Sequence, residues 1–289
     1  MTRTQATATG FGAVLLWALL ALFTVGSAPV PPLLLNALCF GVGGAIGLGW
    51  AAARGRLGVL AGIPLHVYAF GTAGLFGYHF FYFSALRLAP PAQAGLIAYL
   101  WPLLIVLLSG LLPGERLRAG HVLGALVAFG GAALIVGGAA SQGGEAVWAG
   151  YGLACLCALT WAVYSVGSRR LGTVPTEAVA VFCLATAALS LAAHWAVEVP
   201  AWPVGAPGWA AVLALGIGPV GLAFYLWDIG VKQGDIQLLG TASYAAPLLS
   251  TLALVAAGFA EATAQLGLAA LMIAGGALLA ARAGRTRTA

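Results

Sequence analysis

The chain has 289 residues, of which 62% are hydrophobic and only 7% are charged, and its formal net charge is +5. A soluble domain carries roughly 25% charged residues, so this composition excludes a water-soluble globule. Apolar runs of about 18 residues or more recur along the chain, and each is long enough to cross a hydrocarbon layer about 30 Å thick. The sequence therefore predicts an all-α integral membrane protein.

Ten apolar runs are separated by short clusters of turn-forming and charged residues. In chain order, the predicted spans are 8–26, 30–53, 64–87, 91–111, 119–138, 148–168, 176–197, 208–231, 236–257 and 262–282. The first run follows Arg3 as a signal peptide would, but nine similar runs come after it, so we interpret it as a retained span. A basic tail, 283–289, follows the last span.

The basic residues divide unequally between the two sides that ten spans create. Eleven lie on the side of the N-terminus: Arg3, Arg54, Arg56, Arg116, Arg118, Arg169, Arg170, Lys232, Arg282, Arg285 and Arg287. Only Arg87 lies on the other side. Because cytoplasmic loops carry the excess of Lys and Arg, this division predicts a multi-pass membrane protein with both termini, and the basic tail, in the cytoplasm.

An internal repeat relates the two halves of the chain. At an offset of 145 residues, Gly95–Leu104 (GLIAYLWPLL) aligns with Gly240–Leu249 (GTASYAAPLL). The predicted units are a first five-helix repeat, 8–138, and a second, 148–282. Because five is odd, the second repeat enters the membrane inverted relative to the first, an arrangement that many secondary transporters use for alternating access.

Two prolines, Pro102 and Pro247, align in this repeat near the middle of the fourth and ninth spans. A proline inside a helix removes one backbone hydrogen bond and leaves a carbonyl group in need of another partner. The pair is therefore a candidate for hinge or gating positions. Tolerated kinks that are packed inside the protein are the alternative.

The sequence resembles the drug/metabolite transporter superfamily, in its EamA-type branch of ten helices. The resemblance is carried by the AYLWPLL segment that contains Pro102, by Gly-Glu-Arg at Gly114–Arg116, and by the second copy around Tyr244 and Pro247. It implies two inverted five-helix repeats around a central cavity, with the fifth and tenth spans at the periphery. The YHFFYF and YLWP segments are similar to those of bacterial exporters of aromatic and other amino acids, and this similarity implies a bacterial inner (plasma) membrane.

Polar side chains deep in the membrane are candidates for a functional site. His79 lies near the centre of the third span, and Tyr78, His79 and Tyr82 fall within about 100° of arc on a helix. An imidazole that only holds helices together is the alternative for His79. Further candidate substrate-binding residues lie on the first, fourth, sixth and ninth spans: Trp17, Tyr99, Trp101, Trp161, Tyr164 and Tyr244.

Asp228 in the eighth span is a candidate for proton coupling, but Lys232 lies one helical turn away. An i,i+4 ion pair is the simpler interpretation. The four cysteines lie in apolar runs and are interpreted as small buried hydrophobes. The sequence thus predicts no metal site, no catalytic residue and no cofactor.

These observations predict a secondary transporter that exports aromatic and other neutral amino acids by alternating access through an aromatic-lined cavity. Export of another small metabolite or drug is one alternative, and a channel or an intramembrane enzyme is another. The sequence lacks HExxH, a P-loop and paired membrane aspartates, so we do not expect an enzyme. The expected partners are a small-molecule substrate and the lipid bilayer, without nucleic acid. The residues leave open substrate range, proton coupling, and monomer or homodimer.

Overall fold

The computed structural model describes residues 1–89, 91–136, 145–256 and 263–285. The last four residues of the predicted basic tail, 286–289, lie outside the described residues. Within the described ranges the chain is helical and contains no β-strand. The predicted all-α fold class is confirmed.

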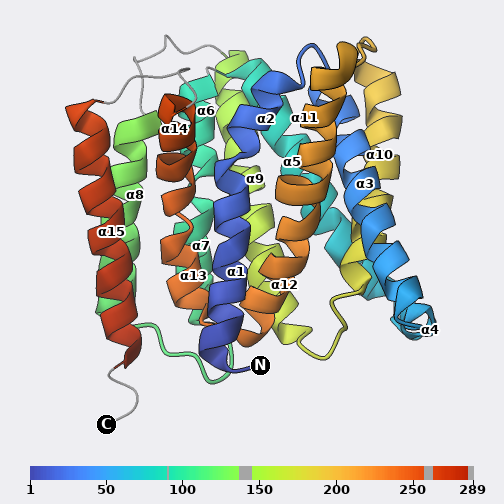
Figure 1. Cartoon of the computed structure of the whole chain (residues 1–289). Coiled ribbons are helices and arrows are strands. Elements are labelled where there is room, and N and C mark those ends of the chain that lie inside the picture. Colours follow the sequence, from blue (N-terminus) through green and yellow to red (C-terminus); the bar gives the residue numbers. More distant parts are fainter. Residues whose placement is uncertain (90, 137–144, 257–262, 286–289) are drawn as a thin grey trace.

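The helices follow one another with short connections (Figure 1). In chain order they are α1 (Arg3–Ala18), α2 (Leu20–Gly26), α3 (Pro32–Ala53), α4 (Leu57–Ala61), α5 (Leu65–Leu88), α6 (Pro91–Ala98), α7 (Trp101–Ser109), α8 (Ala119–Val136), α9 (Glu145–Arg170), α10 (Ala178–Val197), α11 (Gly205–Ile217), the π-helical segment η1 (Gly218–Leu222), α12 (Ala223–Gln233), α13 (Ile236–Ala242), α14 (Ala245–Ala256) and α15 (Ala264–Arg285).

Four of the ten predicted spans are interrupted rather than continuous. The first breaks at Leu19, the fourth at 99–100, the eighth at η1 and the ninth at 243–244. In the described residues, five helical stretches are long and apolar enough to cross a membrane by length and composition, and two of them run across the breaks at Leu19 and η1. A search for apolar runs joins the two halves of a broken span, because the break changes backbone geometry without changing hydropathy. The short helix α4 was not predicted.

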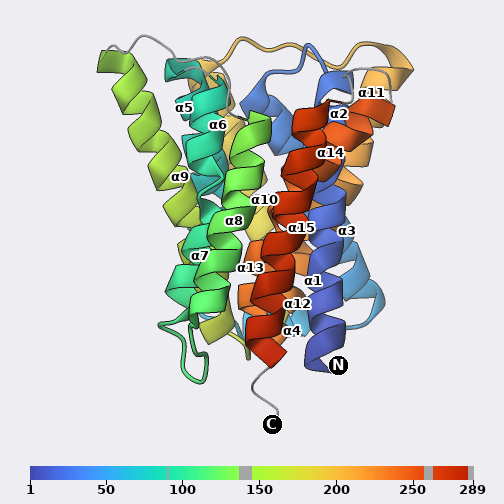
Figure 2. The ribbon, with the colours of Figure 1, turned by 90° about the vertical axis from the view of Figure 1, so that its left-hand side faces the viewer.

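The two repeats run in opposite directions through the bundle. Figure 1 shows that α1 begins, and α15 ends, at the same end of the molecule, which we call the terminal end. The second repeat begins with α9 at the opposite end. Figure 1 shows α8 and α15 at the edge of the bundle, and Figure 2 shows them side by side, as the family resemblance implies for the fifth and tenth spans.

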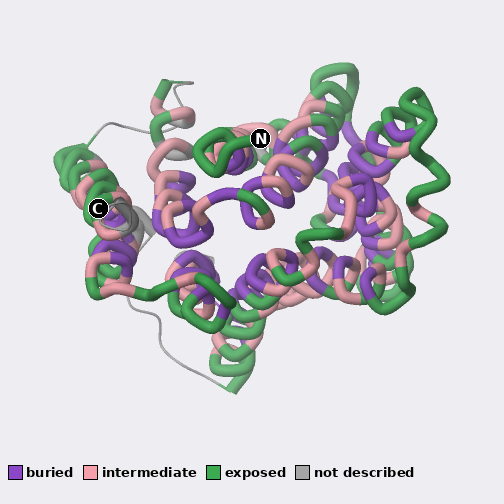
Figure 3. Tube along the Cα trace, turned by 90° about the horizontal axis from the view of Figure 1, so that it is seen from below, coloured by how far each residue is buried: buried purple, intermediate pink, exposed green. Residues whose placement is uncertain are grey.

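The closest helix pairs each join one helix from the first repeat with one from the second. They are α8 with α15, α3 with α10, α5 with α9, and α1 with α12. Small residues let these backbones approach, since lipid offers no hydrophobic drive for helix association. Where α1 meets α12, a Cβ on Gly10 would lie 2.8 Å from the Cα of Gly230, and a Cβ on Gly43 of α3 would likewise lie 2.7 Å from the Cα of Gly221 in η1. Figure 3 shows exposed residues mainly on the outside of the resulting bundle.

The α8–α15 contact provides a matched pair of substitutions. A Cβ on Gly276 would overlap the carbonyl oxygen of Gly124 and lie 2.8 Å from the backbone nitrogen of Ala128, whereas Gly275 has open space. We expect Gly276→Ala to destabilise the protein by about 1–3 kcal/mol, because the two backbones must separate. Thermal unfolding in detergent measures the effect, with Gly275→Ala as the control. Equal melting temperatures would contradict the close contact.

A buried carboxylate organises the end opposite the terminal end. Glu198 follows α10, and its side chain is 1% exposed. Its oxygens accept hydrogen bonds from the backbone N–H groups of Leu33 and Leu34, at 3.1–3.2 Å, where Pro31 offers α3 no side-chain cap. Arg87 at the end of α5 pairs with the same carboxylate at 2.5 Å. Glu198 therefore joins α3, α5 and α10.

Candidate functional site

Four tryptophans and a phenylalanine meet in the middle of the bundle. Trp17 comes from α1, Trp101 from α7, Trp161 from α9, and Phe224 and Trp227 from α12. Ring centroids lie 5.1 Å apart for Trp17 and Trp227, and 5.8 Å apart for Trp17 and Trp161. Edge-to-face and offset contacts at these distances are the favoured geometry for aromatic pairs. We call these five side chains the aromatic cluster.

The predicted face of α5 lies beside the aromatic cluster. The rings of Tyr78 and Tyr82 are parallel, with an interplanar angle of 3° and centroids 6.1 Å apart. Tyr78 also contacts Trp161 at 5.3 Å. His79 turns toward Phe40 of α3 in an edge-to-face contact, with ring centroids 5.0 Å apart. The three predicted residues are therefore neighbours, but His79 faces α3 while the two tyrosines face α9.

The hydrogen bond of His79 defines its tautomer. Its Nδ1 lies 2.7 Å from the carbonyl oxygen of Leu75. A carbonyl oxygen only accepts, so Nδ1 carries the proton, and Nε2 of the neutral ring is an acceptor. Leu75 lies on the same helix α5, so this bond does not itself join two helices, and it leaves Nε2 able to accept a hydrogen bond from an N–H group.

The breaks in the fourth and ninth spans are linked to each other. Tyr99 and Tyr244 occupy these breaks, and Pro102 lies in the first turn of α7, where a helix needs no N–H donor. Tyr244 is fully buried, and its hydroxyl accepts a hydrogen bond from the backbone N–H of Leu103 at 3.1 Å. This N–H group has no partner within α7. Pro247 lies at the third position of α14. Whether either proline is a hinge stays a prediction.

Removal of the Tyr244 hydroxyl should weaken the link between the two breaks. In Tyr244→Phe, the N–H of Leu103 loses its partner in a buried place, so we expect a loss of about 1–3 kcal/mol in the free energy of unfolding. Tyr68→Phe is the control, because the Tyr68 hydroxyl donates to the carbonyl of Leu60 near the membrane surface, where water can replace it. Titration with a denaturing detergent measures both. A larger loss in Tyr68→Phe would contradict this role.

Exposure divides the predicted site residues into two sets. Partly exposed side chains are Trp17, Tyr78, His79, Tyr82 and Tyr99. Buried side chains, which support the first set, are Trp101, Trp161, Tyr164 and Tyr244. The ring of Tyr164 fills the space above Gly74 and stacks on Phe70, so it holds α9 against α5.

Sequence reasoning missed three aromatic residues of this region: Phe40, Phe224 and Trp227. The repeat offset of 145 already places Phe224 on His79 and Trp227 on Tyr82. Trp227 donates its indole N–H to the hydroxyl of Ser165 at 3.0 Å. The indole N–H of Trp17 donates to the carbonyl of Pro219, inside η1, at 3.0 Å. The π-helical segment thus supplies an acceptor that a regular helix would have used internally.

Comparison with known proteins decides the family. The EamA-like transporter family matches the chain twice, over residues 5–137 and 148–282. The chain belongs to the EamA-like transporter family. This membership confirms the family predicted from the sequence. It also accounts for the two repeats of the fold.

Several curated relatives share one printed name. A protein of Ancylobacter novellus named aromatic amino acid exporter YddG is 58% identical over 283 residues, which cover 97% of this chain and 98% of the relative. Proteins of the same name from Salmonella typhimurium and Escherichia coli are 28% and 25% identical over 55% and 65% of this chain. A solved crystal structure, 57% identical, matches with a TM-score of 0.93 and covers 98% of this chain and 100% of its own.

The ion pair predicted for this EamA-like chain in the eighth span is confirmed. Lys232 Nζ lies 2.8 Å from Asp228 Oδ2, and both side chains are buried. The hydroxyl of Thr176 donates to the same oxygen at 2.7 Å, and Lys232 also donates to the carbonyl of Val174. Asp228 therefore fixes the turn before α10 against α12. Among the described residues, no group of three potential ligands could hold a metal ion.

Proposed function

We propose that this chain exports aromatic and other neutral amino acids across a bacterial inner membrane by alternating access. The observation that carries the proposal is the relative that is 58% identical over nearly the whole chain and is named an aromatic amino acid exporter. The inverted repeats support alternating access, because two halves of opposite orientation can exchange conformations. The division of basic residues supports a cytoplasmic terminal end.

The partly exposed set of aromatic residues suits such a substrate. The phenol rings of Tyr78 and Tyr82 and the indole of Trp17 offer π faces, on which an aromatic ring can stack and toward which an ammonium group is attracted. Nε2 of His79 offers an acceptor for an N–H group. In this proposal, these residues and Tyr99 contact the substrate, while the buried set holds them in place.

Release from liposomes tests the proposal. Liposomes that contain the purified protein and preloaded labelled amino acid should lose the label faster than protein-free liposomes. Equal rates for Phe, Trp, Thr and Met with and without protein would refute amino-acid export. A parallel run with a labelled cationic drug addresses the alternative substrate class. Runs with and without a pH gradient separate proton-coupled export from facilitated diffusion.

Substitution of His79 tests the site. We expect His79→Ala to lower the release rate about three- to tenfold, which corresponds to the loss of about one hydrogen bond. His66→Ala is the matched control, because His66 is exposed on the same helix α5. Both variants should reach the membrane in similar amounts. Unchanged transport in His79→Ala would leave only the structural role of this side chain.

A further inference from the structure

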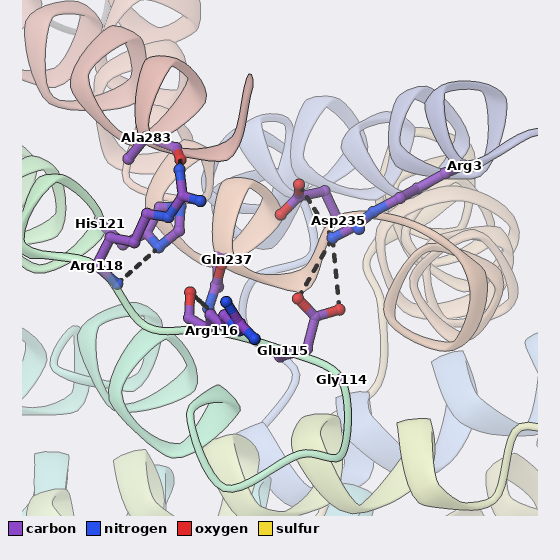
Figure 4. Close-up of a pocket in the computed structure, with 9 residues that line it drawn as sticks. All are labelled: Arg3, Gly114, Glu115, Arg116, Arg118, His121, Asp235, Gln237 and Ala283. Atoms are coloured by element: carbon purple, nitrogen blue, oxygen red, sulfur yellow. Dashed lines mark hydrogen bonds and ion pairs between the residues drawn. The ribbon is translucent and has the colours of Figure 1, made fainter. Parts of the chain in front are cut away.

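Glu115, the acidic residue of the Gly-Glu-Arg motif, lies at a meeting point of four segments at the terminal end. It follows α7, and its side chain is only 4% exposed. Arg3 of α1 and Arg169 of α9 both pair with it, and Asp235 lies between α12 and α13 on the other side of Arg3. Figure 4 shows Arg3, Glu115 and Asp235 pointing toward one another beside a cavity of about 280 Å³.

These four segments belong to two walls of the bundle. The first wall is α1 with α12, which pack closely at Gly10 and Gly230. The turn that contains Asp235 belongs to it, because the backbone N–H of Asp235 donates to the hydroxyl of Thr7 of α1 at 2.8 Å. The second wall is α7, the 110–118 loop after it, and α9, which pack against each other. Glu115 and Arg169 belong to this second wall.

Ionic contacts occur both within each wall and between the walls. Within the walls, Arg169 lies 2.6 Å from Glu115, and Arg3 lies 3.2 Å from Asp235. Between them, Arg3 Nη2 lies 3.4 Å from both oxygens of Glu115. Arg169 Nη1 donates across to the carbonyl oxygens of Val231 and Gly234, at 2.9 and 2.7 Å. The shorter ion pairs are thus those within a wall.

We infer that Glu115, with Arg3 and Arg169, is a latch that closes the terminal end and releases each time the transporter loads substrate from the cytoplasm. The inference rests on the proposed alternating access. Breaking a buried ion pair is costly when it leaves a charge without a partner. When the two walls separate, each keeps its own ion pair: Arg3 stays paired with Asp235, and Arg169 stays paired with Glu115. The latch therefore holds the walls together and still opens at modest cost.

Labelling of a buried cysteine tests the latch without any substrate. In a background whose four native cysteines are replaced by alanine, Val231→Cys places a thiol in a fully buried position beside the latch. A membrane-impermeant maleimide is added from the terminal side. Arg3→Gln removes the ion pair between the walls and leaves the bonds of Arg169 to the carbonyls in place, so we expect labelling to be about two- to fivefold faster, the range for a partly exposed ion pair. Arg54→Gln is the control, because the Arg54 guanidinium lies over the ring of Trp50.

Chemical cross-linking tests the movement itself. In the same background without Val231→Cys, the pair Arg3→Cys and Glu115→Cys joins the two walls, whereas Arg3→Cys with Asp235→Cys joins two positions of the first wall. Treatment with a bis-maleimide should abolish most of the amino-acid release by the first double variant. The second double variant should release amino acid at the same rate before and after treatment. A mono-maleimide controls for modification alone.

The possible results separate the latch from the proposed function. Faster labelling in Arg3→Gln, together with arrest only by the link between walls, supports the latch. Unchanged labelling, or continued release after that link, overturns it. Faster labelling in a protein that releases no amino acid would support the latch while it refutes the proposed substrate class.

Discussion

Glu198→Ala should cost about 3–5 kcal/mol of stability, because several buried groups lose their shared partner at once. The carboxylate accepts from the first N–H groups of α3, pairs with Arg87, and lies 2.9 Å from Nδ1 of His194. Without it, the start of α3 has no cap and the buried His194 loses its partner, whereas the Arg87 side chain, which is 44% exposed, can turn to solvent. Titration with a denaturing detergent, followed by circular dichroism, measures the loss.

Two variants control this measurement. Glu145→Ala removes an exposed carboxylate from the first turn of α9 and should change stability by less than about 0.5 kcal/mol. Glu198→Gln keeps an acceptor for the α3 N–H groups but removes the charge, so its loss should be intermediate. A Glu198→Ala protein as stable as Glu145→Ala would contradict the joining role of this residue.

Trp161→Ala should be the most damaging substitution in the middle of the bundle. The indole contacts Trp17, Trp101, Trp227, Phe224, Tyr78 and Tyr164. Its removal forfeits dispersion contacts with all of them and leaves a void, so we expect a loss of about 3–5 kcal/mol in the free energy of unfolding. Tyr78 also loses the ring that positions it, and amino-acid release should fall with stability.

Trp148→Ala is the matched control, because this tryptophan lies on the same helix α9 and is 68% exposed. Its removal should leave both stability and release nearly unchanged. Trp161→Phe should lose less stability and less amino-acid release than Trp161→Ala, because the smaller ring still fills part of the void. Equal effects of Trp148→Ala and Trp161→Ala would show that the aromatic cluster does not position the site.

Hydropathy and the repeat offset together predicted the fold class and the ten passages, whereas the family was predicted from the resemblance of short motifs. Both signals act over many residues, so a local irregularity does not erase them. The breaks at Leu19, 99–100 and 243–244 escaped prediction, because each is a change of backbone direction within an apolar run. Pro102 marks one of them, but a proline alone does not separate a kink from the start of a new helix.

Spacing on one helix predicted that Tyr78 and Tyr82 are neighbours, and their stacked rings confirm it. It could not predict which neighbouring helix each side chain meets, and so His79 toward Phe40 of α3 was not foreseen. Exposure is also a property of the packed bundle. Trp101 and Tyr99 are two residues apart, yet the first is buried and the second is partly exposed. Their roles as substrate contacts stay predictions.

The pairing of α8 with α15, and of α1 with α12, has a consequence for biosynthesis. Each helix of these pairs is separated from its partner by more than a hundred residues of chain. When the ribosome has completed only the first repeat, the glycine faces of α1, α3 and α8 are in the membrane without their final neighbours. Either lipid or an insertion factor must cover them until the later helices emerge. α1 waits longest, because more of the chain separates it from α12 than separates α8 from α15.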